Sequence, residues 1–279
     1  MAKRMLIGVK NFDTSQAAVR WGAERATAGG LGVQLVHVVD EAMRRGGSGL
    51  LQATRSDVES MLAASADLVR SVAAVEVTTQ VVDGNPLNEL VRLSQDADMV
   101  VVGSDSTGDD RPSRHGTRGF RIAAASTTPV AVIPNIDLAR RNGVVVGVDG
   151  SPNSAHALDF AVNEADRLGE PLIAVNAWPN PVVYGYDLAF PVEYVEDLTE
   201  ISNEILTTAL NEATRTHPNV RVRRVVAEGD PVTVLTEEAD TASLVVVGSH
   251  GRGAMARFLL GSVSHGVLAR LASPTVIVR

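Results

Sequence analysis

The sequence predicts two tandem α/β domains, each with a five-stranded parallel sheet flanked by helices. Three observations support this prediction: the chain length, an internal repeat, and the alternation of short apolar runs with helical periodicity. A chain of 279 residues has the length of roughly two ordinary domains. Strands that alternate with helices form parallel sheets with right-handed crossovers.

The repeat defines the domain organisation. Residues 80–86 (QVVDGNP) reappear as 225–231 (VVAEGDP), and residues 98–104 (DMVVVGS) reappear as 243–249 (SLVVVGS), both at an offset of 145. Near the start of each half, residues 6–9 match 145–148 at an offset of 139, so the second half has a six-residue insertion, most simply within residues 178–191. A polar segment with breakers at both ends joins the halves. We therefore predict domains over residues 1–141 and 142–279.

The elements of the second half follow from local patterns, taken in chain order. Short apolar runs are typical of strands buried on both faces, and apolar residues at helical spacing predict amphipathic helices. Ser154 is the expected N-cap of the first helix, Gly169 its C′ residue, and Pro231 suits the first turn of the third helix. The expected strands cover residues 144–148, 172–177, 220–226, 244–247 and 274–278, and the expected helices cover about 154–168, 195–210, 231–240 and 262–271.

Composition restricts the class of protein. The chain is 45% hydrophobic and 21% charged, with a net charge of −8, which disfavours binding to nucleic acid backbones. It has no cysteine, which excludes thiol catalysis and thiolate metal sites and fits a reducing compartment. The apolar run at the N-terminus is too short for a signal peptide, and no run approaches the roughly 20 residues of a membrane helix. We expect a cytoplasmic protein without nucleic acid partners or membrane insertion.

A glycine-rich loop follows the fourth strand of the second half. Its pattern is Gly248-x-x-Gly251, nine residues, then Gly261-Ser262 at the start of a helix. Glycine has no Cβ and can take positive φ, so such loops let backbone amides close around phosphates beside a helix N-terminus. The alternative is a flexible turn between strand and helix. Ligands of parallel sheets bind beyond the carboxyl ends of the strands, where this loop starts.

The whole framework resembles the universal stress protein family. The resemblance extends over both halves and includes, besides the loop, the first-strand segment 146–151 (VGVDGS), the Gly229-Asp-Pro231 motif and the closing segment 274–278. It implies Rossmann-like domains of the adenine nucleotide alpha hydrolase-like type. It also implies ATP binding in members that carry the full loop, and pairing of the halves through their last strands, 130–133 and 275–278.

The resemblance assigns roles to residues of the second half. Asp149 would lie beside the adenosine, the backbone near Ala177 would meet adenine, and the loop glycines and the helix start would surround the phosphates. Arg252 and His250 could add cationic contacts, although solvated loop positions are the alternative. The expected ATP-binding residues are Gly147, Asp149, Ala177, Gly248, Ser249, His250, Gly251, Arg252, Gly253, Gly261, Ser262, Val263 and Ser264.

The corresponding positions of the first half differ in charge. Lys10 replaces Asp149 and Ser106 replaces Gly251, while three aspartates, at 105, 109 and 110, fall in the loop that would face a triphosphate. Unit charges of like sign about 4 Å apart repel by roughly 1 kcal/mol in water and about 4 kcal/mol near a protein surface. We predict that the second domain binds nucleotide tightly, and the first weakly or not at all.

The sequence lacks the usual catalytic motifs. It has no P-loop lysine motif and no G-x-S-x-G turn, and its histidines and carboxylates show no metal-ligand spacing. We therefore expect no catalytic residues and no protein-built metal site, with any Mg²⁺ carried by ATP. The leading hypothesis is a non-enzymatic, ATP-binding stress or signalling protein with an unknown protein partner. The alternatives are a nucleotide-independent interaction module and a slow ATPase or related enzyme. A homodimer is left open.

Overall fold

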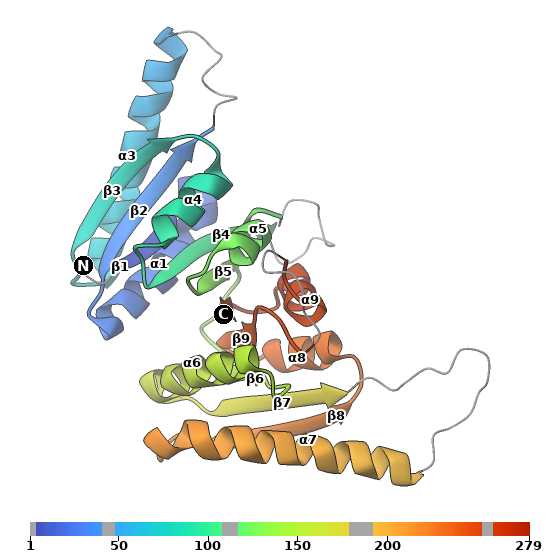
Figure 1. Ribbon diagram of the computed structural model, residues 1–279. Helices are drawn as coiled ribbons and strands as arrows, with labels where there is room; N and C mark the ends of the chain where they lie inside the picture. Colours follow the sequence, from blue (N-terminus) through green and yellow to red (C-terminus); the bar gives the residue numbers. More distant parts are fainter. Residues whose placement is uncertain (1–3, 41–47, 108–116, 179–191, 253–258) are drawn as a thin grey trace, which may run out of the picture. The chain divides into compact units, whose positions relative to one another are not determined.

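The computed structural model describes residues 4–40, 48–107, 117–178, 192–252 and 259–279 (Figure 1). It divides the chain into two compact units, Met1–Ile136 and Asp137–Arg279. Arg141 packs within the second unit, where its Nη1 donates to the carbonyl oxygens of Ala239 at 3.0 Å and Ala272 at 2.7 Å.

The first unit contains a parallel sheet in the order β3-β2-β1-β4-β5. Helices α1 and α3 pack against each other, as do α4 and α5. Its elements are β1 (Arg4–Gly8), α1 (Phe12–Gly29), β2 (Gly32–Val39), α3 (Ser48–Val72), β3 (Val77–Asp83), α4 (Pro86–Ser94), β4 (Met99–Thr107), α5 (Thr117–Ala125) and β5 (Val130–Asn135).

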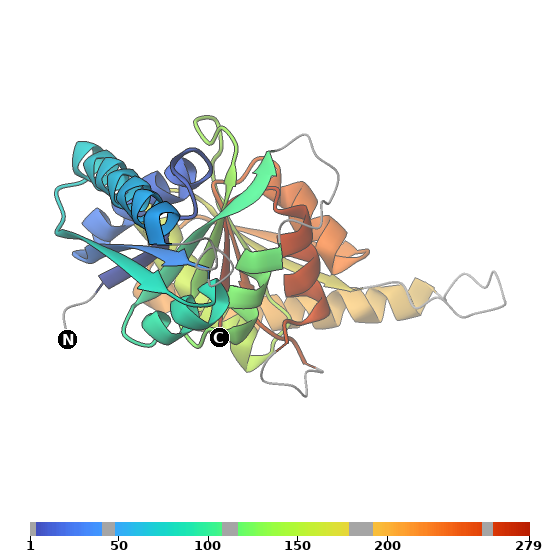
Figure 2. The same ribbon diagram turned by 90° about the horizontal axis from the view of Figure 1, so that it is seen from above.

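The second unit repeats this topology in the order β8-β7-β6-β9-β10. Helix α6 packs with α7. Helix α8 lies beside α9, as Figures 1 and 2 show. Its elements are β6 (Val144–Gly147), α6 (Pro152–Leu168), β7 (Leu172–Trp178), α7 (Val192–Ala213), the 3-10 turn η1 (Thr214–Thr216), β8 (Val222–Glu228), α8 (Pro231–Ala239), β9 (Leu244–Gly248), α9 (Ser262–Arg270) and β10 (Thr275–Val278).

The predicted fold class is confirmed in both units. Central strands are buried on both faces, with Val144, Val145 and Val146 of β6 fully buried, as expected for a parallel sheet covered by helices. Gly169 ends α6 with φ 67°, in the left-handed conformation predicted for it.

The predicted N-cap of α6 is wrong. Ser151, not Ser154, caps the helix: its Oγ accepts a hydrogen bond from the Ser154 backbone N–H at 3.3 Å, and Pro152 occupies the first helical position. Proline suits that position because the N–H it lacks would have no partner within the helix. The third strand also differs, since it runs over Val222–Glu228 rather than 220–226.

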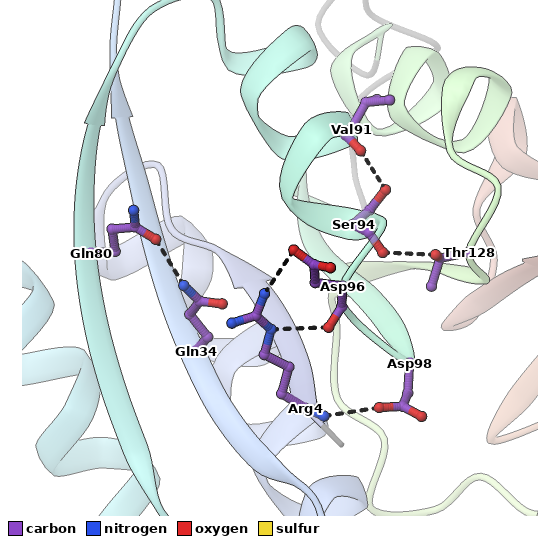
Figure 3. Close-up of polar contacts among 8 residues, drawn as sticks. All are labelled: Arg4, Gln34, Gln80, Val91, Ser94, Asp96, Asp98 and Thr128. Atoms are coloured by element: carbon purple, nitrogen blue, oxygen red, sulfur yellow. Dashed lines mark hydrogen bonds and ion pairs between the residues drawn. The ribbon is translucent and has the colours of Figure 1, made fainter. Parts of the chain in front are cut away.

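Polar contacts join the segments before the strands of the first unit (Figure 3). The backbone N–H of Arg4 donates to Asp98 Oδ2 at 2.9 Å. The side-chain Nε of Arg4 donates to the carbonyl oxygen of Asp96 at 3.1 Å. Thr128 Oγ1 donates to the Ser94 carbonyl at 2.8 Å. These contacts fix the amino-terminal edge of the sheet, whereas the opposite, carboxyl-terminal edge is where parallel sheets place ligands.

Candidate functional site

A cavity of about 430 Å³ lies at the carboxyl edge of the second sheet, near β6 and β9. The strand order reverses between β6 and β9, so the chain continues from these two strands toward opposite faces of the sheet. A crevice forms between the two connections. The cavity is lined by Gly147, Val148, Asp149, Ser154, Val175, Ala177, Pro231, Leu235, Val247, Gly248, His250, Gly251, Arg252, Gly261, Ser262, Val263 and Ser264.

The structure brings together most of the residues that the sequence indicated. Eleven of the thirteen line this cavity, and Ser249, which is not among the lining residues, is buried at 2% exposure. Gly253 lies outside the described residues. The residues come from the ends of β6, β7 and β9 and from the start of α9, so one edge of the sheet collects segments that are distant in the sequence.

Two loop glycines are needed for close approach rather than for a left-handed backbone, since neither has positive φ. A Cβ on Gly251 would lie 2.5 Å from Asp149 Oδ2, so this glycine lets the loop pass directly over the carboxylate. A Cβ on Gly248 would lie 2.9 Å from the backbone of Asn153, at the start of α6. Gly248 therefore has a packing role in the fold, besides lining the cavity.

Helix α9 points its N-terminus into the cavity. Gly261 is its N-cap residue and provides no side-chain hydrogen bond, and the first three helical residues, Ser262, Val263 and Ser264, all line the cavity. The backbone N–H groups of a first helical turn have no partners within the helix and carry the positive end of its dipole. This end of the cavity can accept an anion.

The hydroxyl of Ser264 contacts the loop. Buried at 1% exposure, its Oγ is placed to donate to the carbonyl of Ser249 at 3.0 Å or of Gly261 at 3.1 Å. The backbone N–H of Gly261 also donates to the Ser249 carbonyl, at 2.8 Å, and the Ser249 N–H donates to Val278 O at 2.7 Å. Ser249 thus fixes the loop to both α9 and β10.

Asp149 is an ionised, well-held carboxylate. Burial opposes its ionisation, but hydrogen bonds from Ser151 and Ser154 and the charge of Arg252 together lower the pKa of Asp149 below its ordinary value of 3.8. The Ser151 N–H donates to Oδ1 at 2.9 Å. Arg252 packs over Gly150, where its Nη2 lies 2.9 Å from the position that a Cβ would occupy.

Apolar residues also line the cavity, and several of them were missed by the site prediction. Pro231 and Leu235 come from α8, and the only sequence signal for them is the repeated motif before that helix. Asn176 was also missed: it is buried, and its Nδ2 donates to the Val148 carbonyl at 2.7 Å. The repeat could have indicated Asn176, because another polar residue, His37, stands at the matching position of the first half. The two make equivalent contacts, since His37 Nδ1 lies 2.8 Å from the carbonyl oxygen of Val9.

The residues that the structure describes contain no cluster of three or more histidine or carboxylate side chains able to hold a metal ion. Within the same ranges, no helix combines the length and apolar character that crossing a membrane requires.

Fold and cavity together define a tandem α/β protein whose second sheet has a ligand-sized cavity at its switch point. The model of the universal stress protein family matches residues 1–134 and again 141–279, so the chain belongs to that family. A universal stress protein of Mycolicibacterium smegmatis is 32% identical over 287 residues, covering 99% of this chain and 96% of the relative. One from Mycobacterium tuberculosis is 32% identical over 291 residues, with the same coverage of both chains.

A solved structure agrees with the fold. The crystal structure of a universal stress protein from Archaeoglobus fulgidus superimposes with a TM-score of 0.73 at 17% identity, covering 99% of this chain and 96% of that one.

Proposed function

We propose that the second domain, residues 142–279, binds ATP, and that the protein acts as a non-enzymatic stress-response or signalling protein regulated by nucleotide occupancy. The observation that carries the proposal is that apolar side chains and an uncapped helix N-terminus line the same cavity. Adenine presents flat aromatic faces that apolar side chains can cover, whereas the triphosphate is strongly anionic, so ATP matches both features at once.

The lining residues suggest how ATP would be held. Val148, Val175 and Leu235 would contact the adenine, and the carboxylate of Asp149 would accept hydrogen bonds from the ribose hydroxyls. The N–H groups at the start of α9 would receive the phosphates, with Arg252 adding a positive charge. Mg²⁺ bound to the phosphates would complete the ligand without a dedicated protein site.

The same residues are poorly suited to catalysis. A general base works best when its pKa lies near the operating pH, but the pKa of Asp149 is lowered and the carboxylate is already hydrogen-bonded to Ser151. We therefore propose that bound ATP is sensed rather than rapidly hydrolysed, and that the protein works in the cytoplasm, where ATP is available.

Released ligand and calorimetry test the proposal. The purified full-length chain is denatured and any nucleotide is identified by mass spectrometry, and the nucleotide-free protein is then titrated with ATP. We expect one tight site, abolished by Ala177→Trp, which would fill the adenine end, and unaffected by the matched change Val38→Trp in the first unit. Absence of both released nucleotide and binding would favour the interaction module, and turnover of about 1 per second or faster would favour an enzyme.

A further inference from the structure

The first unit has a larger cavity than the second at the corresponding edge of its sheet. Its volume is about 730 Å³, and it lies near the ends of β1, β2 and β4. Helix α3 contributes Asp57, Val58 and Met61 to its lining, whereas none of the residues 195–213, the described side chains of the matching helix α7, lines the second cavity. The first cavity therefore extends to α3.

The chain also leaves the central strand differently in the two units. Strand β9 ends at Gly248, and the next residue, Ser249, is fixed to α9. In the first unit β4 continues to Thr107, which pairs with Asn135 of β5. The segment that turns over the cavity in the second unit is thus an extended strand in the first.

The contact that holds the second loop has no counterpart at the matching position of the first unit. Gly119 stands where Ser264 stands in the repeat, so no hydroxyl is available there. A side chain at this glycine would also crowd Val132, whose Cγ1 would lie 3.2 Å from the Cβ. The hydroxyl that ties the second loop to its helix is therefore not reproduced at this position of the first unit.

The lining of the first cavity is mainly apolar, and its charges are divided between two sides. Lys10, after β1, and Arg121, on α5, bring positive charge to one side. Asp40, after β2, and Asp57, on α3, bring negative charge to the other. One anionic group suits the first side, whereas a chain of phosphates would also meet the carboxylates. The apolar lining comes from Val9, Val36, Val38, Val39, Val58, Met61, Pro86, Leu87, Leu90, Val102 and Ile122.

We propose that the first unit binds a second ligand of a different class: a mainly apolar, aromatic-sized small molecule with a single carboxylate. The carboxylate lies toward Lys10 and Arg121, and the apolar body fills the space bounded by α3 and α4. The protein thus carries two unlike ligand sites, and the first does not depend on ATP binding by the second.

The test uses 2-naphthoate as the probe and its uncharged analogue 2-naphthamide as the control, both titrated into the full-length chain by calorimetry. We expect naphthoate to bind one site with the same affinity in the absence and presence of saturating ATP. The change Val38→Trp fills the cavity beside β2 and should abolish this binding, whereas the matched change Ala177→Trp in the second unit should preserve it. Ala177→Trp should lose only ATP binding.

The charge contribution is measured separately, in a variant that keeps the cavity open. Lys10→Met should weaken naphthoate binding by about tenfold and leave naphthamide binding unchanged, because only the carboxylate loses a partner. Thermal unfolding checks that each variant is folded. Failure of naphthoate to bind, its displacement by ATP, or equal effects of Lys10→Met on both probes would overturn the inference. Whichever of these results is obtained, the proposed function is still supported if the wild type binds ATP and Ala177→Trp does not.

Discussion

A methyl group added at Gly251 tests whether the loop must pass directly over the Asp149 carboxylate. The added Cβ would lie 2.5 Å from Oδ2, about 0.9 Å short of the 3.4 Å at which ordinary contact begins. The carboxylate cannot shift freely, because the Ser151 N–H holds its other oxygen at 2.9 Å. Either the loop rises or the carboxylate loses its hydrogen bonds. Overpacking of this kind costs about 1–3 kcal/mol of stability.

The same displacement should reduce ATP affinity, because it moves both the loop amides and the group proposed to meet the ribose. We expect Gly251→Ala to weaken binding by at least about tenfold, equivalent to the loss of one good hydrogen bond. Calorimetric titration with ATP measures the affinity, and urea denaturation of the same samples measures the free energy of unfolding.

A double variant distinguishes a local clash from a general disturbance of the loop. With Asp149→Ala in place the carboxylate is absent, so Gly251→Ala should then cost little further stability, and the two effects should be strongly non-additive. Unchanged stability and affinity in the single variant, or strictly additive costs in the double variant, would refute the argument.

Asp149, two glycines at matching positions of the repeat, and Ser264 give three further predictions. Folding lowers the pKa of Asp149, so the stability that its ionisation contributes is present above its ordinary pKa of 3.8 and is lost as the pH falls through the lower folded value. The free energy of unfolding of Asp149→Asn should therefore depend less on acid than that of the wild type. Urea denaturation between about pH 5 and 2 measures this difference. Gly248→Ala and Gly103→Ala, at matching positions of the repeat, should each destabilise their own unit by about 1–3 kcal/mol in thermal unfolding, because each added Cβ would lie within 3.0 Å of helix backbone. Wild-type stability in either variant would show that the helix can move away. Ser264→Ala should lower stability by about 1 kcal/mol through loss of its hydrogen bond to the loop. It should also weaken ATP binding less than Gly251→Ala does. A larger loss of ATP affinity in Ser264→Ala than in Gly251→Ala would point to a direct contact of the hydroxyl with phosphate.

The order of elements could be predicted from the sequence because each depends on local chemistry. Apolar runs such as Val144–Val146 and the left-handed cap at Gly169 carry their own signals. The N-cap of α6 was misplaced because Ser151 and Ser154 are both N-cap residue types, and only the proline that follows Ser151 distinguishes them.

Features that depend on contacts between distant segments were not predictable in the same way. The packing role of Gly248 arises from the backbone of Asn153, which is 95 residues earlier in the chain. The extension of β4 to Thr107 depends on pairing with Asn135, and nothing in a polar sequence such as Asp-Ser-Thr indicates that partner. The charge differences between the halves were readable from the repeat, but the size of the first cavity was not.

The double anchoring of Ser249 has a practical consequence for engineering. The N–H of this residue is bonded to β10 and its carbonyl to Gly261, so hydrogen bonds hold together the two residues that flank the segment 250–260. Closing a longer excursion at such a point adds only about 0.6 kcal/mol for each doubling of its length. A reporter peptide inserted after Arg252 would therefore leave the helix start in place, making this position an entry point for a fluorescent sensor of cavity occupancy.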